Sequence, residues 1–561
     1  MIRVRDEGPG SPGALIRFLA AVLVVAACGG STSTTASTIA PTASAATTLP
    51  AATTTVAPST STTTTTLAAV PLPTPFDPLG ATIQEIQDAM EDGTITSVAL
   101  VEFYLNRIAA YDDRGPSLNA VLTLDPSARE EAAALDAERR RQGPRSPLHG
   151  IPILLKDNIG TADMPTTAGT VALAGFVPVA DAFQVARLRA AGAIILGKTN
   201  LHEFARDITT VSSLGGQTRN PFDPTRNPGG SSGGTGAAIA AEFATVGLGT
   251  DTCGSIRVPS AHNHLYGLRP TQGLSSRTGV MPLSFSEDTV GPMARSVADL
   301  AIVLDLTAGY DPDDPQSVVT NGSYLEAAVP TGLEGKRIGV LESLFADADP
   351  EVVREVRAAL DLMEAHGAEV VNGDVPGLAG LRGSATSVFL REFRTAFDAY
   401  LAGQPEAPFA SLAAIVATGM YHPSLDDRLQ SALSATIDDA AYRDALRRRE
   451  QVRSAVESFM EAHDLDALAY PAIRRPAAKI GQRQSGSNCA TASLGGLPAL
   501  VVPAGFTDAG LPVGLELLGS SFTEETLIAI AAGYEAQAPP RSLPPTAPPL
   551  FWADPWHPAL P

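Results

Sequence analysis

The segment 227–257 reads NPGGSSGGTGAAIAAEFATVGLGTDTCGSIR and combines serines with many glycines. Ser231 and Ser232 lie between glycine pairs, and Ser255 follows an apolar run. Glycines allow backbone N–H groups to approach an anion, and they permit dihedral angles that other residues resist. A serine hydroxyl is a weak nucleophile until a neighbouring base takes its proton. The segment could therefore bind a phosphate, attack a carbonyl carbon, or form a tight turn.

Lysine is the residue that could activate such a serine without a histidine. It is rare in this chain and occurs only at Lys156, Lys198, Lys336 and Lys479. Lys156 ends the apolar run GIPILLK, which predicts a buried strand. Burial disfavours the charged ammonium and lowers the lysine pKa, so an amine at this position could be a neutral base for a serine.

Two short motifs indicate other chemistry but lack the required flanking structure. GAIILGKT, from Gly192 to Thr199, matches the P-loop pattern, yet its middle residues predict a buried strand where a P-loop needs a turn. GGSSG fits the nucleophile elbow of α/β-hydrolases around Ser231, but the preceding PFDPTRNP cannot be a central strand. We therefore predict a structural role for Lys198. No suggestive setting surrounds the later histidines His262, His264, His422 and His463.

The elements that must position these residues alternate between helix and strand. Thr82 and Glu85 predict a capping box for a helix that stops at Gly93. Further helices are predicted over 97–111, 127–142, 181–192, 234–243 and 350–367. Strands are predicted over 150–156, 193–198, 244–251, 337–342, 368–371, 466–472, 498–505 and 513–519. This alternation predicts an α/β fold, a single large domain over 77–540 with a sheet covered by helices on both faces.

The composition limits the classes of partner. Hydrophobic residues make up 44% of the chain and charged residues 18%, as in ordinary globular proteins. The net charge of −21 argues against binding to nucleic acid, which needs a basic surface. Three cysteines are too few for a disulfide scaffold.

The N-terminus predicts an export signal. Arginines precede FLAAVLVVAAC, whose apolar run is too short to span a bilayer but suits a signal peptide over 1–27. The ending VAAC resembles a bacterial lipobox, in which Cys28 becomes the lipidated first residue; a plain secretory signal is the alternative. Residues 28–76 are rich in Ser, Thr, Pro and Ala and predict a disordered stalk, and 541–561 form a proline-rich tail.

Several longer segments together resemble the amidase signature family. They are GIPILLKDNI, GGQTRNPFDPTRNPGGSSGGTGAAIAA, GTDTCGSIRVPSAHNHLYGLRPTQG, PLSFSEDTVGPMARSVADLA and GGLPALVVPAGFTDAGLPVGLELLG. They occur in the family's order between about Thr82 and Glu535, which is most of the predicted domain. The resemblance implies a mixed β-sheet core in this domain.

The family's Ser–Ser–Lys triad corresponds to Lys156, Ser231 and Ser255 in this sequence. Their separations of 75 and 24 residues agree with the family pattern. The resemblance implies a cis peptide bond between Gly230 and Ser231. It also implies that Lys156 takes a proton from Ser231, which takes one from Ser255, the nucleophile that forms an acyl-enzyme. The mechanism that the resemblance implies needs no metal and no cofactor.

The resemblance implies an oxyanion hole made by backbone N–H groups around Thr252, Cys253, Gly254 and Ser255. Cys253 departs from the pattern because many family members have glycine there. It could pair with Cys489, but we favour two unpaired thiols that pack as small hydrophobic groups. For Ser232, Asp251 and Arg257 we expect hydrogen-bonding roles that hold the loops rather than chemistry.

Three functions are compatible with these observations. The leading hypothesis is an exported amidase, tethered to the membrane by its N-terminal lipid, that hydrolyses a small-molecule or short-peptide amide. A solute-binding lipoprotein would share the anchor and stalk but has no use for the triad. An amidotransferase A-subunit shares the family, but an export signal does not suit that role. A weaker resemblance to bacterial peptide amidases surrounds GGQTRNP and SFSEDTVGPM. We expect the segment from about Thr307 to Asp464 to shape the substrate pocket, but no motif is readable in it.

Overall fold

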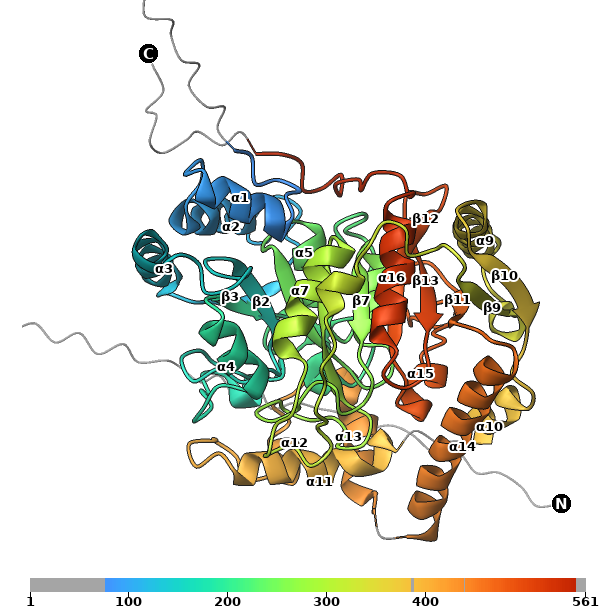
Figure 1. Cartoon of the computed structure of the whole chain (residues 1–561). Coiled ribbons are helices and arrows are strands. Elements are labelled where there is room, and N and C mark those ends of the chain that lie inside the picture. Colours follow the sequence, from blue (N-terminus) through green and yellow to red (C-terminus); the bar gives the residue numbers. More distant parts are fainter. Residues whose placement is uncertain (1–75, 385–387, 438, 551–561) are drawn as a thin grey trace, which may run out of the picture. The chain divides into compact units, whose positions relative to one another are not determined.

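Eleven strands form one mixed sheet within the described residues of the computed structural model, which are 76–384, 388–437 and 439–550. The strand order is β1-β3-β2-β6-β8-β7-β12-β13-β11-β9-β10 (Figure 1). Parallel pairing joins β2 to β3 and β6, and joins β9 to β10 and β11, whereas the other neighbours are antiparallel. The strands are β1 (Val121–Leu124), β2 (Pro152–Lys156), β3 (Ile194–Thr199), β6 (Val246–Asp251), β7 (Tyr266–Arg269), β8 (Thr289–Ala294), β9 (Arg337–Leu341), β10 (Glu369–Gly373), β11 (Ala467–Pro471), β12 (Ala499–Phe506) and β13 (Pro512–Leu518).

Helices cover both faces of this sheet, which confirms the predicted α/β fold (Figure 1). The N-terminal half contributes α1 (Ile83–Glu91), α2 (Ser97–Tyr111), α3 (Ala128–Gln142), α4 (Phe183–Ala190), α5 (Gly233–Ala240), α6 (Arg257–His262) and α7 (Val297–Thr307). The C-terminal half contributes α8 (Tyr324–Ala327), α9 (Pro350–Ala365), α10 (Leu378–Ser384), α11 (Phe389–Ala402), α12 (Leu412–Thr418), α13 (Asp426–Ser434), α14 (Ala440–Ala462), α15 (Ala490–Gly495) and α16 (Glu524–Glu535). A separate two-stranded ribbon pairs β4 (Val211–Ser212) with β5 (Gly216–Gln217).

Helix α1 begins where its sequence signal predicts. The Thr82 hydroxyl accepts a hydrogen bond from the Glu85 N–H, and the Glu85 carboxylate accepts one from the Thr82 N–H. This capping box satisfies two N–H groups that the first turn leaves without helical partners. Ile83 and Ile86 then lie on one side of the helix and are fully buried.

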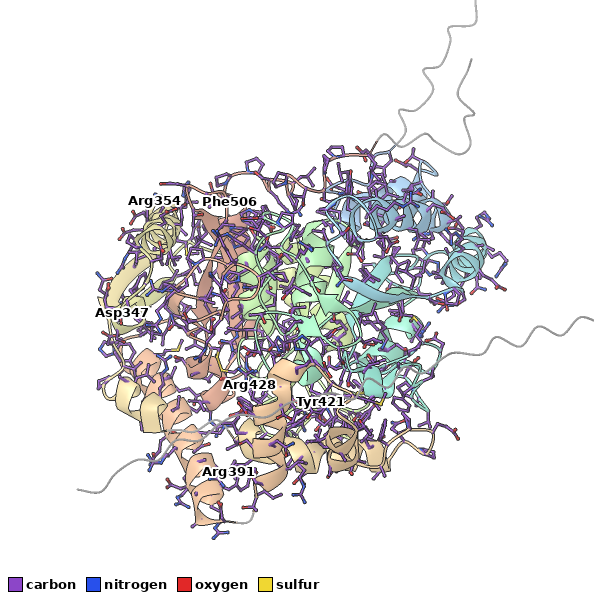
Figure 2. All side chains as sticks on the ribbon, turned by 180° about the vertical axis from the view of Figure 1, so that it is seen from behind. Asp347, Arg354, Arg391, Tyr421, Arg428 and Phe506 are labelled. Atoms are coloured by element: carbon purple, nitrogen blue, oxygen red, sulfur yellow. A yellow bond between two sulfur atoms is a disulfide. The ribbon has the colours of Figure 1, made fainter. Side chains whose placement is uncertain are left out.

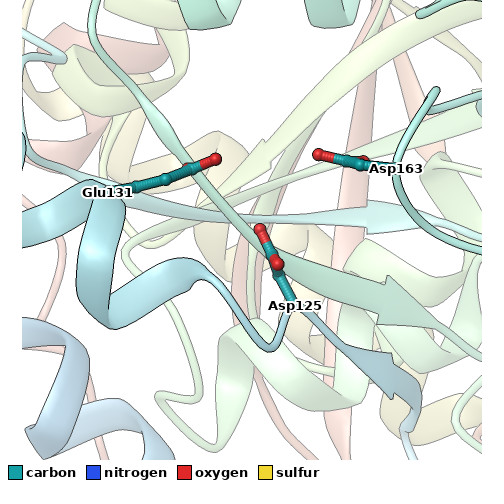
Figure 3. Close-up of side chains that lie close together, drawn as sticks. All are labelled: Asp125, Glu131 and Asp163. Carbon is teal, nitrogen blue, oxygen red and sulfur yellow. The ribbon is translucent and has the colours of Figure 1, made fainter.

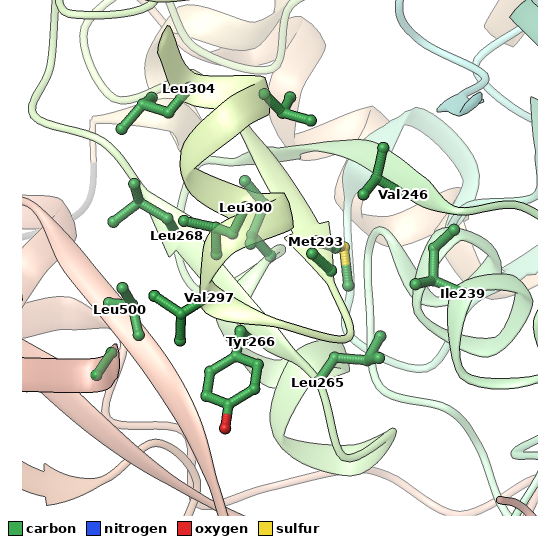
Figure 4. Packing of buried hydrophobic residues seen from close by; sticks show 14 of the residues in the cluster. Ile239, Val246, Leu265, Tyr266, Leu268, Met293, Val297, Leu300, Leu304 and Leu500 are labelled. Atoms are coloured by element: carbon green, nitrogen blue, oxygen red, sulfur yellow. The ribbon is translucent and has the colours of Figure 1, made fainter. Parts of the chain in front are cut away.

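The centre of the core lies between the middle strands and the helices that cross them. Leu300 of α7 packs among Leu268 of β7 and Met293 of β8, while Ile239 of α5 lies beside Val246 of β6 (Figure 4). All five side chains are fully buried. Burying an aliphatic side chain of this size stabilises a fold by about 1.5–3 kcal/mol, so this apolar layer fixes the strands that carry the site.

The parallel strands β2 and β6 are neighbours, and this pairing sets the position of the candidate site. Leu154 pairs with Gly247, and Leu155 pairs with Leu248. The carboxyl ends of both strands therefore meet at one edge, where β2 ends at Lys156 and β6 continues into the loop before α6. Ligands of open α/β sheets characteristically bind at this edge.

The last described residues pack against the N-terminal helices. Arg107 of α2 donates to the Ala547 carbonyl at 2.9 Å, and Arg541 forms an ion pair with Glu242 at 2.7 Å. The proline-rich segment is therefore held on the fold as far as residue 550. The signal peptide 1–27, Cys28, all but the last residue of the stalk, and residues 551–561 lie outside the described residues. Within the described ranges, no helix has both the length and the apolar character needed to cross a bilayer.

Candidate active site

Lys156 and Ser231 are in direct contact although they are 75 residues apart in the sequence. Nζ of Lys156 lies 2.7 Å from Oγ of Ser231. Its other neighbours are two oxygens of Thr250, the hydroxyl at 2.7 Å and the carbonyl at 3.3 Å. Both side chains are fully buried. The end of β2 and the segment before α5 thus bring together the first two predicted site residues.

Burial changes the acid–base behaviour of this lysine. Removal from water lowers the pKa of Lys156 from 10.5 to about 7, and the carboxylates of Asp288 and Asp251 act in the opposite direction. No ion pair involves Lys156 within the described part of the chain. A lysine with this pKa is partly neutral at neutral pH and can accept a proton.

Lys198 is the second fully buried lysine, and its contacts are structural. Burial lowers the pKa of Lys198 to about 8. Nζ donates to the Ile159 carbonyl and to the Thr166 hydroxyl, both at 2.6 Å. Residues 194–199 form the buried strand β3, as predicted, and leave no flexible loop that could surround a phosphate.

The glycines around Ser231 are required by close packing. The Gly230–Ser231 peptide bond is cis. A Cβ atom on Gly230 would lie 2.8 Å from the Thr210 hydroxyl, and one on Gly234 would lie 2.1 Å from the Asn200 carbonyl oxygen. These contacts are too short for any side chain, so the glycine cluster serves a tight turn rather than an anion site.

Ser255 lies beside this turn. Its carbonyl accepts a hydrogen bond from the Ser232 N–H at 3.1 Å, and only 4% of the residue is exposed. No hydrogen bond joins the side chains of Ser231 and Ser255 within the described ranges. The Ser232 hydroxyl contacts both the carbonyl and the N–H of Thr250, at 3.2 and 3.3 Å, which confirms its expected role as a hydrogen-bonding neighbour.

The predicted oxyanion hole needs one correction. The Gly254 N–H donates to Oδ1 of Asp251 at 2.8 Å, so it is not available to an oxyanion. The prediction missed this contact because Asp251, the last residue of β6, reaches the loop through its side chain, which the sequence pattern does not show. No acceptor within the described residues contacts the N–H groups of Thr252, Cys253 and Ser255, which leaves these three as candidate donors.

A buried ion-pair network holds the loop. Asp251 pairs with Arg257 at 3.2 Å and with Arg269 at 3.0 Å, and Arg257 also pairs with Glu516 at 2.5 Å. Although burial by itself raises the pKa of Asp251, the two guanidinium groups hold it well below its usual range. Asp251 therefore stays ionised and keeps its hydrogen bonds to the N–H groups of Gly254 and Ile256. This confirms that Asp251 and Arg257 hold the loop.

Cys253 and Cys489 form a disulfide, so the expectation of two unpaired thiols is wrong. Cys489 is the residue before α15, and the fold places its Cα atom 5.2 Å from that of Cys253. The two residues are 236 positions apart in the sequence, which is why spacing could not predict the contact. The bond ties the loop that carries Ser255 to the C-terminal half of the fold.

A pocket of about 460 Å³ opens beside Ser255. The Cys253–Cys489 disulfide forms part of its wall together with Thr252. Its size is within the usual range for sites that bind small molecules. Leu283, from the segment PLSFSEDTVGPMARSVADLA, also lines the pocket. Other lining residues come from segments without readable motifs: Arg206, Phe389, Leu390, Arg428 and Arg483.

Sequence reasoning missed these pocket residues and His202. The His202 N–H donates to the Ser231 carbonyl at 3.0 Å and so helps to fix the turn that precedes α5. Arg428 belongs to α13 and lies among the helices of the segment 307–464 (Figure 2). No local pattern marks these positions, because each acts through contacts with distant segments.

Three carboxylates converge away from the serines. Asp125 follows β1, Glu131 lies on α3 and Asp163 follows β2, and their oxygens point toward one another (Figure 3). Arg189 forms ion pairs with Glu131 at 3.3 Å and with Asp163, and also with Asp181 at 3.2 Å. The guanidinium already neutralises part of this cluster, which therefore has a structural explanation.

Comparisons with known proteins agree with this geometry. The family model described as Amidase matches residues 99–528. The A-subunit of the glutamyl-tRNA(Gln) amidotransferase of Roseiflexus sp. (strain RS-1) is 40% identical over 479 residues, which cover 81% of this chain and 96% of that protein. The native peptide amidase of Stenotrophomonas maltophilia is 41% identical, with a TM-score of 0.77 over 83% of this chain and 98% of that one. An amidase family protein from Bacillus anthracis str. Ames is 32% identical, with a TM-score of 0.76 over 83% and 92% of the two chains. The chain belongs to the amidase signature family and is a hydrolase of amide C–N bonds.

Proposed function

We propose that this protein hydrolyses a carboxylic amide to a carboxylate and ammonia or an amine through an acyl-enzyme on Ser255. In this proposal Lys156 is the general base and Ser231 relays the proton. The observation that carries it is the contact of 2.7 Å between Nζ of Lys156 and Oγ of Ser231. Lys156 has no ion pair among the described residues, and its lowered pKa supplies a share of the neutral form that a base needs.

The hydrogen bonds around Nζ support the direction of proton transfer. A neutral amine has two N–H bonds and one lone pair. The Thr250 carbonyl can only accept, so it takes one N–H, and the Thr250 hydroxyl takes the other. Asn158 Nδ2 donates to the same hydroxyl at 3.2 Å and so helps to hold it as an acceptor. The lone pair is left facing the O–H of Ser231.

The proposed reaction balances its protons within the three residues. Lys156 takes the proton of Ser231, Ser231 takes the proton of Ser255, and the Ser255 oxygen bonds to the amide carbon. The N–H groups of Thr252, Cys253 and Ser255 stabilise the oxyanion, an effect of about 3 kcal/mol for one donor in a known enzyme. The proton then passes to the leaving nitrogen as the C–N bond breaks. In the second half of the reaction a water molecule takes the place of Ser255: it gives its proton to Ser231 and Lys156 as it attacks the ester, and the proton returns to the Ser255 oxygen as the ester bond breaks.

A second candidate function is that of an amidotransferase component. The 40% identity to the A-subunit of a glutamyl-tRNA(Gln) amidotransferase over 81% of this chain favours it. The two functions differ in what accepts the nitrogen. An amidase releases ammonia from its substrate on its own, whereas an A-subunit would act on glutamine and depend on further subunits.

We propose in addition that the protein is exported and anchored through lipid on Cys28, and that the membrane is its partner on the extracytoplasmic side. The Cys253–Cys489 disulfide supports export, because disulfides persist mainly in oxidising compartments. In a bacterial host the full chain should partition with membranes, and Cys28→Ser should move it to the medium or leave it unprocessed. Equal partitioning of both forms, without lipid in the mass spectrum, would contradict the anchor.

The hydrolysis itself is tested with a panel of aliphatic, aryl and peptide amides, with glutamine included, by measuring ammonia release from the purified chain. We expect turnover by the wild type on at least one amide other than glutamine and none by Ser255→Ala. A chain that releases no ammonia from any amide, and that binds small solutes equally well with Ser255→Ala, would favour the solute-binding alternative. Ammonia released from glutamine alone would favour the amidotransferase.

A further inference from the structure

The pocket beside Ser255 carries an excess of positive charge in a chain whose net charge is −21. Arg206, Arg428 and Arg483 line it, and Asp207 is the acidic residue among the lining side chains. Asp207 forms an ion pair with Arg428 at 2.6 Å and so neutralises that arginine. Two guanidinium charges therefore remain without an acidic partner among the described residues.

Arg206 is buried although its hydrogen bonds are incomplete. Only 6% of the residue is exposed. Nη2 donates to the Arg428 carbonyl at 3.1 Å, but among residues 76–384, 388–437 and 439–550 Nε and Nη1 have no hydrogen-bond partner, and both atoms are buried. Its guanidinium carbon lies 4.8 Å from the ring centre of Phe393 and 5.9 Å from that of Phe389, which stabilises the cation but supplies no acceptor. A buried donor without an acceptor is rare in native proteins and requires an explanation.

The backbone before Arg206 is held in an unfavourable conformation. Phe204 and Ala205 have φ angles of +53° and +57°, a region that side chains with a Cβ atom seldom adopt. Such conformations concentrate at functional sites, where surrounding contacts enforce them. Here the Arg206 carbonyl accepts from Nη1 of Arg428 at 2.6 Å, and the preceding His202 donates to the Ser231 carbonyl. These contacts fix Arg206 relative to the serine turn.

Arg483 is the second arginine of the pocket that has no acidic partner among the described residues. It lies on the loop before Cys489, its side chain is exposed, and within the described ranges it has neither an ion pair nor a hydrogen bond. The pocket is also lined by the apolar side chains of Ile208, Leu283 and Leu390, together with polar residues of the loop before Cys489. A ligand with a short apolar chain and an anionic end would contact both the apolar side chains and the two arginines of this pocket.

We propose that the amide substrate carries a carboxylate, which binds Arg206 and Arg483 while Ser255 attacks the amide carbon. The inference deepens the proposed amidase function and rests on it. When the substrate binds, the Arg206 guanidinium turns from its buried position toward the pocket, and the carboxylate supplies the acceptors that Nε and Nη1 lack. Guanidinium groups match carboxylate geometry. Arg206 is then a specificity-determining residue, which acts on substrate preference.

The test compares amides that differ only in charge. Succinamate, glutaramate and adipamate each carry one amide and one carboxylate, and succinamide, glutaramide and adipamide replace the carboxylate with a neutral amide of the same size. Ammonia release gives kcat/KM for each pair. For the chain length that fits, we expect the wild type to prefer the carboxylate at least tenfold. In Arg206→Met the preference should fall to near one, mainly through KM, and Arg206→Lys should restore only part of it.

Arg354→Gln is the matched control, because Arg354 lies on α9 and pairs with Asp508 and Glu355 away from the pocket (Figure 2). It should keep the wild-type preference. Equal kcat/KM for carboxylates and diamides in the wild type, or an unchanged preference in a folded Arg206→Met, would overturn the proposal while leaving the amidase function intact.

A binding measurement separates failure of the inference from failure of the proposed function. Calorimetry of succinate, glutarate and adipate should show binding of one of them to the wild type and at least tenfold weaker binding to Arg206→Met. If no amide is turned over, the proposed amidase function is rejected. Binding of a diacid that depends on Arg206 would still support the carboxylate site in that case. Absence of binding by all three diacids, together with no preference in turnover, would reject the site.

Discussion

The protonation of Lys156 should control the rate of hydrolysis. With a pKa of about 7, roughly 1% of Lys156 is neutral at pH 5 and about 99% at pH 9. Because only the neutral amine accepts the Ser231 proton, kcat/KM for a neutral amide should rise about 100-fold between pH 5 and pH 9. The curve should show one ionisation near pH 7. The assay is ammonia release at constant ionic strength with a substrate that does not titrate in this range.

A substitution at Thr250 identifies which lysine is responsible. The Thr250 hydroxyl contacts Nζ of Lys156 at 2.7 Å, whereas Lys198 bonds to Ile159 and Thr166 instead. A hydrogen bond to a charged group contributes about 1 kcal/mol more than one to a neutral group. Loss of the hydroxyl in Thr250→Val should therefore destabilise the protonated lysine and lower its pKa by roughly 0.7 units, since about 1.4 kcal/mol corresponds to one unit.

The midpoint of the rate profile should move down by that amount in Thr250→Val. Lys156→Arg should be nearly inactive at every pH, with a loss of about 10²–10⁴-fold, because a guanidinium stays protonated. A wild-type profile that is flat between pH 5 and 9, or a midpoint that does not move in Thr250→Val, would refute the assignment of Lys156 as the base.

Three further predictions concern stability and specificity. The double variant Cys253→Ser/Cys489→Ser should lose about 2–4 kcal/mol of unfolding free energy and some of its kcat, since the bond closes a long loop and holds a candidate oxyanion donor; unchanged denaturant midpoints and kcat would contradict this. Lys156→Met should raise the unfolding free energy at pH 7, and this gain should shrink toward pH 10.5. Between these pH values the unfolded lysine keeps its proton while the folded lysine loses it, so the wild type becomes more stable as the pH rises. A gain that does not change with pH would contradict the lowered pKa. ATP should not bind in calorimetry, because the residues of the P-loop match form strand β3; affinity that Lys198→Ala abolishes would reverse this conclusion.

Most elements near the site were predictable from local patterns. The apolar run that ends at Lys156 and the capping box at Thr82 fix their elements within a few residues, as the structure confirms. The central strands β7 and β8 were not predicted. Both are short, and β8 contains Gly291 and Pro292, which usually weaken a strand. Gly291 is needed because a Cβ there would lie 2.1 Å from the Leu268 carbonyl oxygen, a tertiary contact that no local pattern reveals.

The residues of the candidate site also fall into those that the sequence predicts and those that only the structure reveals. The family resemblance gives Lys156 and Ser231, and the fold brings them into contact. Three features of the site depend on contacts between distant segments or on the path of one loop. They are the Cys253–Cys489 disulfide, the hydrogen bond from the Gly254 N–H to Asp251, and the incomplete hydrogen bonding of Arg206. Spacing along the chain carries no information about such contacts, so only the folded structure reveals them.

The proposed mechanism depends most directly on which serine attacks the amide carbon. A fluorophosphonate probe that traps activated serines, followed by peptide mapping, measures this in one experiment. We predict that the label is found on Ser255 in the wild type, that Ser255→Ala removes it, and that Lys156→Arg slows it strongly. A label on Ser231 or Ser232, or labelling of Ser255 at the full rate in Lys156→Arg, would contradict the proposed relay.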